Sequence, residues 1–427
     1  MDTSSQKRKG PSWKRDDIEV ARQEALEWRG FRPLPPTKGV GEAPDPISPD
    51  RRPTSLDGQG PRMRILLEGQ VIRDTYEVER YLAEGAFAEV YRVRHRFLGR
   101  QAMKVFKQVG MTQDEIDEKM AEAALLSRIG HPNIVRVFDA NLLDTPNGQY
   151  GYFTMENIPG GSLDKFWRSH GGRLVPLETT IDIVKQVCRG LRVAHSEDPP
   201  IIHRDIKPQN ILIGYEADGL RARLSDFGLA RRVNPLTLFA TAAGTLAFKP
   251  PEAREKGDSP SGDIWAVGVT LYLLLTDRLP YEVNPALGWG NQQVFRKKLA
   301  PPSQYNVQAN SEVDRIVMGC LEPRPEDRYP SVGDLLSALD GCRSGRSEKV
   351  VPKSDSVSSL SKDILGPAST PDQAEAEALA QRALQQARDM GRLIDAADLM
   401  EEAFNKWPSL RDKHATRVQL WRRGICM

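Results

Sequence analysis

One short region of the chain contains four side chains whose types and order suit the transfer of a phosphoryl group. Asp205, Lys207 and Asn210 lie in the octapeptide HRDIKPQN, residues 203–210, and Asp226 opens the triplet DFG. Phosphoryl transfer uses a carboxylate that orients the attacking hydroxyl, a cation beside the transferred group, and oxygen ligands for magnesium. Asp205 and Lys207 suit the first two roles, and Asn210 and Asp226 suit the third. The alternative, a coincidental polar loop, is hard to reconcile with so many specified positions.

A second candidate is the segment LAEGAFAEV, residues 82–90, between two expected strands. A hairpin that covers phosphates needs small residues, so that its backbone can approach them closely. Gly85 is the only one present of the three glycines usual in such a hairpin, and Ala83 and Ala88 hold the other two places. Taken alone, this segment is better explained as an ordinary tight hairpin.

Lys104 and Glu122 form a third candidate group. Lys104 lies on an expected strand, and Glu122 lies on the helix expected to follow it. A carboxylate paired with this lysine would hold the ammonium toward the α- and β-phosphates of a nucleotide. The alternative is a surface lysine, which is what a lone lysine on a strand usually is.

The elements that must position these residues change character near residues 156–161. Short segments rich in β-branched and aromatic residues predict strands before this point, and apolar stripes at helical spacing predict mostly helices after it. We therefore expect an α+β, two-lobed layout. The predicted strands are 76–82, 88–94, 101–106, 134–143 and 150–155, and the predicted helices are 112–128, 163–168, 179–195, 263–275, 311–320 and 331–339.

The remaining segments flank this unit. Residues 1–62 are rich in Pro, Gly and charge and predict a mostly disordered tail, with helical spacing only at 16–29. That short stretch is either a transient helix or a docking helix. We assign 63–343 to the main domain, with lobes at 72–158 and 159–343, and 344–371 to a linker.

Residues 372–427 predict a small all-α segment. Ala380, Ala383 and Ala387 mark one helix face, and Ala396 and Met400 mark a second. A third helix is expected at 411–423. The spacing resembles one tetratricopeptide repeat, although a plain helical hairpin fits as well, because a stable array needs three or more repeats.

Composition narrows the classes of function. The 60 Lys and Arg residues nearly balance the 58 Asp and Glu residues, so nothing favours nucleic acid as a partner. Four scattered cysteines predict neither a disulfide framework nor a zinc site and favour a reducing cytoplasm. The N-terminus lacks the apolar stretch of a signal peptide, and the most apolar run, 264–275, is too short to span a bilayer. We therefore expect a cytoplasmic protein with no membrane span.

Taken together, these motifs resemble the eukaryotic-type (Hanks-type) serine/threonine protein kinase family from about residue 76 to 342. The short loops resemble its bacterial members. Further landmarks of the family agree with this alignment: Gly244-Thr245, Pro250-Pro251-Glu252, Asp263-Ile264-Trp265 and Arg328. The resemblance implies the two-lobed protein kinase fold, ATP with Mg²⁺ or Mn²⁺, and protein substrates.

The resemblance also implies a role for each matching residue. Asp205 would be the catalytic base, Lys207 would steady the γ-phosphate, and Lys104, paired with Glu122, would contact the α- and β-phosphates. Asn210 and Asp226 would hold the metal ions. The residues implied to line the nucleotide pocket are Leu82, Gly85, Val90, Ala102, Met155 (the gatekeeper), Glu156 and Ile158 (the hinge) and Leu212. Those implied to stack into an apolar column anchored by Asp263 are Leu126, Val137, His203 and Phe227.

Specificity for serine and threonine is implied by Lys207, two residues after Asp205, and by Thr245. Arg204 belongs, in the family, to a basic pocket that receives a phosphorylated residue of the activation segment. We expect autophosphorylation at Thr241 first, with Thr237 and Thr245 as the other candidates.

Two other classes of function remain open. One is a pseudokinase-like scaffold that binds a protein partner through its C-terminal helices, and the other is a small-molecule phosphotransferase of similar fold. The intact catalytic residues favour an enzyme over a scaffold. The segments around Thr245 and Glu252, which dock peptides in the family, favour a protein substrate over a small molecule.

Overall fold

Every residue that the structure describes lies within Met63–Met427, the second of the two units of the chain. The predictions for the tail, its helix at 16–29 and the linker at 344–371 lie outside the described residues, as does most of the helix predicted at 112–128. The computed structural model describes residues 64–85, 88–107, 117, 120, 127–146, 148–170, 174–227, 246–254, 257–281, 294–295, 297–342 and 373–426.

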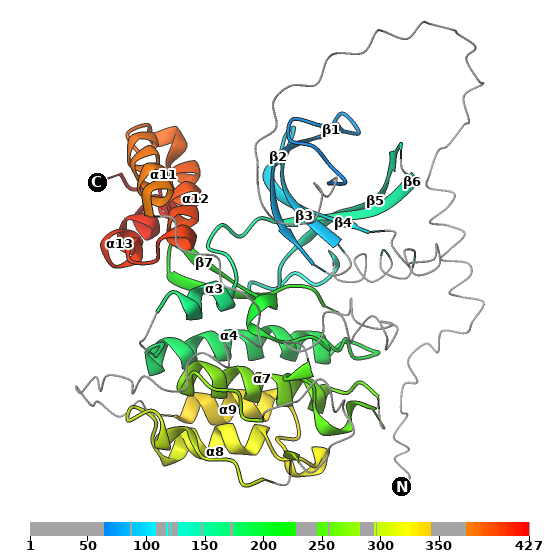
Figure 1. Ribbon diagram of the computed structural model, residues 1–427, viewed down its shortest axis with the longest axis vertical. Coiled ribbons are helices and arrows are strands. Elements are labelled where there is room, and N and C mark those ends of the chain that lie inside the picture. Colours follow the sequence, from blue (N-terminus) through cyan, green and yellow to red (C-terminus); the bar gives the residue numbers. More distant parts are fainter. Residues whose placement is uncertain are drawn as a thin grey trace, which may run out of the picture. The chain divides into compact units, whose positions relative to one another are not determined.

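Antiparallel strands in the order β1-β2-β3-β4-β6-β5 form the sheet of the first lobe (Figure 1). Alternate residues of neighbouring strands, such as Tyr91, Val93, Met103 and Val105, are buried in one cluster, as a two-residue period requires. The five predicted strands are confirmed, and β1 is an additional short edge strand. The bounds are β1 Val71–Ile72, β2 Tyr76–Glu84, β3 Ala88–His95, β4 Gly99–Phe106, β5 Val137–Thr145 and β6 Gly148–Glu156.

Helices dominate the second lobe, as predicted. Its central helix, α7, is buried along almost its whole length, because it is apolar on every face. Ser259 caps its N-terminus by accepting a hydrogen bond from the Gly262 N–H, and Asp277 ends it in the left-handed conformation. The bounds are α3 Leu163–Arg168, α4 Leu177–His195, α7 Pro260–Thr276, α8 Ser311–Cys320 and α9 Val332–Gly341, with 3-10 turns at Pro208–Asn210, Pro251–Arg254, Pro302–Gln304 and Pro325–Asp327.

A β-hairpin within this helical lobe was not predicted from the sequence. Strands β7, Ile211–Glu216, and β8, Gly219–Leu224, pair antiparallel directly after the HRDIKPQN segment. Ala217 and Asp218 form the two-residue turn, and Gly219 begins β8. An Asp-Gly dipeptide between two strand-like segments is a recognised hairpin signal, and Asp218-Gly219 is such a dipeptide. The hairpin matters because its two ends carry Asn210 and Asp226 into one place.

Three helices lie between residues 373 and 422: α11, Gln373–Gln386, α12, Leu393–Lys406, and α13, Leu410–Arg422, with a 3-10 turn at Met390–Arg392. The predicted alanine face is buried in their shared core, together with Phe404 and Trp421. The relation of these helices to a tetratricopeptide repeat stays a prediction. Among the helices that the structure describes, none combines the length and apolar composition needed to cross a bilayer.

Candidate active site

The predicted catalytic loop brings three of its polar side chains together. Lys207 Nζ lies 2.8 Å from Asp205 Oδ2, and Asn210 Nδ2 donates to the same oxygen and to the Asp205 carbonyl oxygen, each at 2.8 Å. The 3-10 turn Pro208–Asn210 reverses the chain so that residues five apart can meet. The amide oxygen of Asn210 is left over from these bonds, and it is a suitable ligand for a hard cation.

A buried carboxylate at the start of α7 fixes this loop. Asp263, with 2% of its surface exposed, accepts hydrogen bonds from the backbone N–H groups of His203 at 2.8 Å and Arg204 at 2.9 Å. His195 Nε2 lies 2.9 Å from the same carboxylate. Arg204 has φ of 68°, a conformation that costs a non-glycine residue about 1 kcal/mol or more. The two bonds to Asp263 help to hold it there.

Lys104 on β4, in the first lobe, contacts Asp226, which follows β8 in the second lobe. The distance from Lys104 Nζ to Asp226 Oδ1 is 2.6 Å. Burial alone would raise the pKa of Asp226, but the charge of Lys104 and its hydrogen bond outweigh burial and hold this pKa below the usual range. Asp226 is therefore an ionised carboxylate, the form that binds a divalent cation.

The rings of His203 and Phe227 pack against each other at a tilt of 41°. Their ring centroids are 4.5 Å apart, and both residues are buried. Burial lowers the pKa of His203, so the ring is neutral near pH 7. Val137, a third member of the predicted column, is also buried, and Leu126 lies outside the described residues.

The residues predicted to line a nucleotide pocket come from both lobes. Ala102 on β4 is directly opposite Met155 on β6, and both are buried. Val90 on β3 is directly opposite Lys104, so it shares a face of the sheet with the lysine. Leu82, Ile158 and Leu212 are half-buried, and Gly85 is exposed, with its N–H donating to the Ala88 carbonyl oxygen at 2.8 Å.

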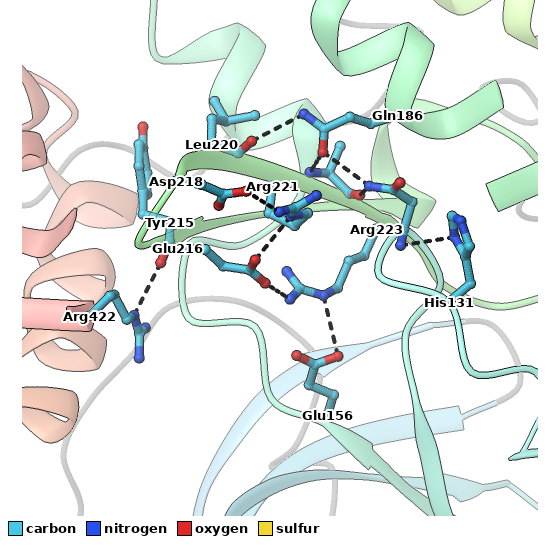
Figure 2. A network of polar contacts seen from close by, with 12 residues as sticks. His131, Glu156, Gln186, Tyr215, Glu216, Asp218, Leu220, Arg221, Arg223 and Arg422 are labelled. Atoms are coloured by element: carbon cyan, nitrogen blue, oxygen red, sulfur yellow. Dashed lines mark hydrogen bonds and ion pairs between the residues drawn. The ribbon is translucent and has the colours of Figure 1, made fainter. Parts of the chain in front are cut away.

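Glu156 connects the segment between the lobes to the β7–β8 hairpin. Its backbone N–H donates to the Arg136 carbonyl oxygen at 2.8 Å, and its carboxylate lies 3.3 Å from Arg223 Nε. Figure 2 shows Arg223 between Glu156 and Glu216. Sequence reasoning missed Arg223, because nothing in its neighbourhood distinguishes it from a surface arginine of a short strand.

An ion pair joins the landmark Glu252 to Arg328. Two parallel hydrogen bonds of 2.7 Å link the guanidinium to the carboxylate, and both side chains are buried. Such a forked arrangement fixes geometry as well as charge. Two landmarks of the resemblance that lie 76 residues apart in the sequence thus meet in the fold.

Several predicted residues cannot be placed in this way. Glu122, Thr237, Thr241 and Thr245 lie outside the described residues, so the pairing of Lys104 with Glu122 and the phosphorylation sites stay predictions. Within the described ranges, no group of three or more His, Cys, Asp or Glu side chains could hold a metal ion. The amide of Asn210 and the carboxylate of Asp226 stay the predicted metal ligands.

Comparisons with known proteins agree with this geometry. The family model of the protein kinase domain matches residues 76–338. A probable serine/threonine-protein kinase of Clostridium acetobutylicum is 28% identical over 64% of this chain and 41% of its own length. Serine/threonine-protein kinase PknB of Mycolicibacterium smegmatis is 30% identical over 63% of this chain and 43% of its own length. The chain thus spans about two-fifths of the length of these curated relatives.

The similarity to solved structures concerns the fold alone. A crystal structure of a double mutant of the Mycobacterium tuberculosis PknI kinase domain superposes with a TM-score of 0.52 at 24% identity. The match covers 65% of this chain and 98% of that one. The two-lobed architecture described above is therefore that of a known kinase domain.

Proposed function

Because the chain belongs to the protein kinase family, we propose that it transfers the γ-phosphoryl group of ATP to serine and threonine side chains of proteins. The observation that carries this proposal is the convergence of Asp205, Lys207 and Asn210 within 2.8 Å contacts, beside the 2.6 Å pair of Lys104 and Asp226. The proposed kinase domain comprises residues 63–343. Its relatives are named serine/threonine-protein kinases.

In the proposed reaction, Asp205 orients the substrate hydroxyl and accepts its proton. Lys207, held against Asp205, places a positive charge where the transferred phosphoryl group gathers negative charge. Lys104 binds the α- and β-phosphates, and Glu122 keeps its ammonium in place.

Asn210 and Asp226 are the residues that would hold magnesium or manganese. The ionised carboxylate of Asp226 and the amide oxygen of Asn210 fit a hard divalent cation, which binds oxygen ligands. The cation, when bound, neutralises charge on the phosphates. Its removal by a chelator should abolish transfer.

The adenine would lie between the lobes. Val90 and Ala102 would cover one face of the base and Leu212 the other, with Leu82 and Gly85 at the entrance. Met155 would close the back of the pocket, and the backbone of Glu156 and Ile158 would pair with the base. The proposed position of the adenine is supported by Val90, Ala102 and Lys104, which share one face of the sheet.

Substrate specificity and regulation are part of the same proposal. Lys207, and Thr245 with its hydroxyl, favour serine and threonine over tyrosine. We propose autophosphorylation at Thr241 first, with Thr237 and Thr245 as the alternatives, and Arg204 as a receiving cation. The competing function is a scaffold that binds a protein partner without catalysis.

The variant Asp205→Asn tests the proposal. Asparagine keeps the shape and can still accept the hydrogen bond from Asn210, but it cannot take the hydroxyl proton. We expect phosphoryl transfer to the protein itself, or to a generic substrate, to fall by about 10²- to 10⁴-fold, with unchanged thermal stability. Mass spectrometry of the two proteins would measure the transfer and locate the phosphorylated residues.

The control is Asp218→Asn, which makes the same chemical change at an exposed turn. This variant should retain wild-type activity. A wild-type protein that transfers no phosphate in the presence of ATP and Mg²⁺ would instead support the scaffold.

A further inference from the structure

The C-terminal helices, residues 373–426, contact both lobes of the kinase fold. On the side of the first lobe, the Glu402 carboxylate on α12 forms ion pairs with Arg92 of β3 and, at 3.0 Å, with Arg80 of β2. Arg100 of β4 lies 3.5 Å from Asp395, also on α12. One helix thus contacts three strands of the first lobe.

The same helix and its neighbour also hold the second lobe. Arg422 on α13 donates to the Tyr215 carbonyl oxygen of β7 at 3.1 Å, a contact drawn in Figure 2. Arg411 Nη1 donates to Ser169 Oγ, just after α3, at 2.5 Å. The ring of Phe404 on α12 packs edge-on against Tyr215, with centroids 5.9 Å apart. Tyr215 is therefore part of the core of the C-terminal helices.

Between these two sets of contacts, α12 meets the segment that joins the lobes. Asn405 donates a hydrogen bond to the Pro159 carbonyl oxygen. Gly161, with φ of +75°, leaves room for this side chain, because a Cβ there would lie 2.8 Å from Asn405 Oδ1. The helix therefore touches the joining segment at its glycines and the lobes on either side of it.

The ion pairs on the first lobe are close to the proposed nucleotide pocket. Arg92 is two residues from Val90 on β3, so both side chains point to the same face of the sheet. Arg92 is directly opposite Ala102 on β4, and Val90 is directly opposite Lys104. A displacement of the Arg92 side chain would therefore move β3 and β4, the strands that carry the proposed adenine-covering and phosphate-binding residues.

The contact between Glu402 and Arg92 is sheltered from solvent. The side chain of Glu402 is 7% exposed and that of Arg92 is 13% exposed, while Glu79 contacts Arg92 from β2 at 2.6 Å. Salt screens buried pairs much less than surface pairs, so this contact persists at physiological ionic strength. Removal of the Glu402 charge takes away one of the two carboxylates that compensate the sheltered Arg92 guanidinium.

From this arrangement, we propose that the C-terminal helices set the position of one lobe relative to the other, and that Glu402 is the positioning residue for nucleotide binding. The proposal rests on the proposed kinase function. Glu402 acts through Arg92 and Arg80 on the strands, while α13 anchors the same module to β7. The distance between the adenine-covering residues Ala102 and Leu212, one from each lobe, depends on this link.

The variant Glu402→Gln tests the proposal in the full-length protein. Glutamine keeps the size of the side chain but cannot neutralise two guanidinium groups. We expect the KM for ATP, and the Kd for a fluorescent ATP analogue, to rise by about tenfold, with kcat changed by less than about twofold. Hydrogen–deuterium exchange should increase in β2, β3 and residues 156–161, but not within α11.

A purely structural role would give a different pattern. Partial unfolding lowers the active fraction, and so kcat, while the KM of the remaining enzyme stays the same. The control Glu375→Gln removes an exposed ion pair with Lys406 inside the module and should change neither constant. If Glu402→Gln fails to fold, Arg80→Gln removes the more exposed partner and should raise KM by about threefold.

The outcomes separate this proposal from the proposed function. An unchanged KM and unchanged exchange at 156–161 in a folded Glu402→Gln variant would overturn the positioning role. If neither the wild type nor any variant transfers phosphate, the kinase proposal fails. The Kd for the ATP analogue and the hydrogen–deuterium exchange then still decide the role of Glu402.

Discussion

At the scale of single residues, two carboxylates, Asp226 and Glu401, show how burial and charge compete. Asp226 is kept ionised by Lys104 in spite of burial, which suits a metal ligand. Glu401, a fully buried residue of α12, has the opposite balance. Burial raises its pKa to about 7, although Arg422, at 2.8 Å, lowers it in part.

The raised pKa of Glu401 predicts a pH dependence of stability. The unfolded chain loses this proton near pH 4.5, its ordinary value, whereas the folded chain keeps it until about pH 7. The folded state therefore binds more protons in this window, and the contribution of Glu401 to stability falls as pH rises from about 4.5 to 7. In Glu401→Gln this contribution should be absent.

The measurement is the difference in unfolding free energy between Glu401→Gln and wild type, taken by urea denaturation at several pH values. As pH rises from about 4.5 to 7, the unfolding free energy of the variant should increase relative to that of the wild type, and the difference should level off above about pH 7. The pH-dependent contributions of the other carboxylates to the unfolding free energy cancel in this difference, because both proteins contain those carboxylates. A difference that stays constant with pH would refute the assignment.

At the scale of elements, strands with a marked β-branched and aromatic composition and helices with apolar stripes were predictable, because each buries one face or is buried entirely. The composition of β3 and β4 and the uninterrupted apolar run of α7 gave correct elements. The β7–β8 hairpin was missed, since six-residue strands inside a helical lobe carry little periodicity. The Asp218-Gly219 dipeptide at its turn was the sequence signal that could have predicted the hairpin.

Gly161 offers a prediction at this scale. Alanine at φ +75° is strained, and its Cβ would also collide with Asn405. We expect Gly161→Ala to lower the free energy of unfolding by about 2 kcal/mol or more, measured by urea denaturation.

Gly69→Ala is the matched control. Gly69 has φ of +81°, but nothing lies within 4 Å of a Cβ built there, so it reports backbone strain alone. Gly161→Ala should cost more than Gly69→Ala, and Asn405→Ala in the same chain should recover part of the excess. Equal costs at the two glycines would argue against a close contact between α12 and the joining segment.

At the scale of the whole molecule, the sequence indicated which helices form after residue 372 but not where they pack. The alanine face of α11 and α12 is a local pattern, so it was readable. The partners of Glu402 are 310 and 322 residues away along the chain, at Arg92 and Arg80. No periodicity links such distant positions. The site around Asp205 was predictable because its four polar residues, Asp205, Lys207, Asn210 and Asp226, lie in one short stretch of sequence.

The packing of the C-terminal helices on β7 predicts a reversal in the effect of one mutation. In the full-length protein Tyr215 is 8% exposed and contacts Phe404, so Tyr215→Ser should lower the unfolding free energy by about 3 kcal/mol. In a chain that ends at Cys342, Tyr215 loses this cover and becomes an exposed aromatic residue. There, Tyr215→Ser should leave stability within about 0.5 kcal/mol and reduce aggregation. Urea denaturation and light scattering of the four proteins would measure both effects. The same loss of stability in the long and the short chain would mean that Tyr215 is buried by the kinase domain itself, and that the C-terminal helices do not share a core with it.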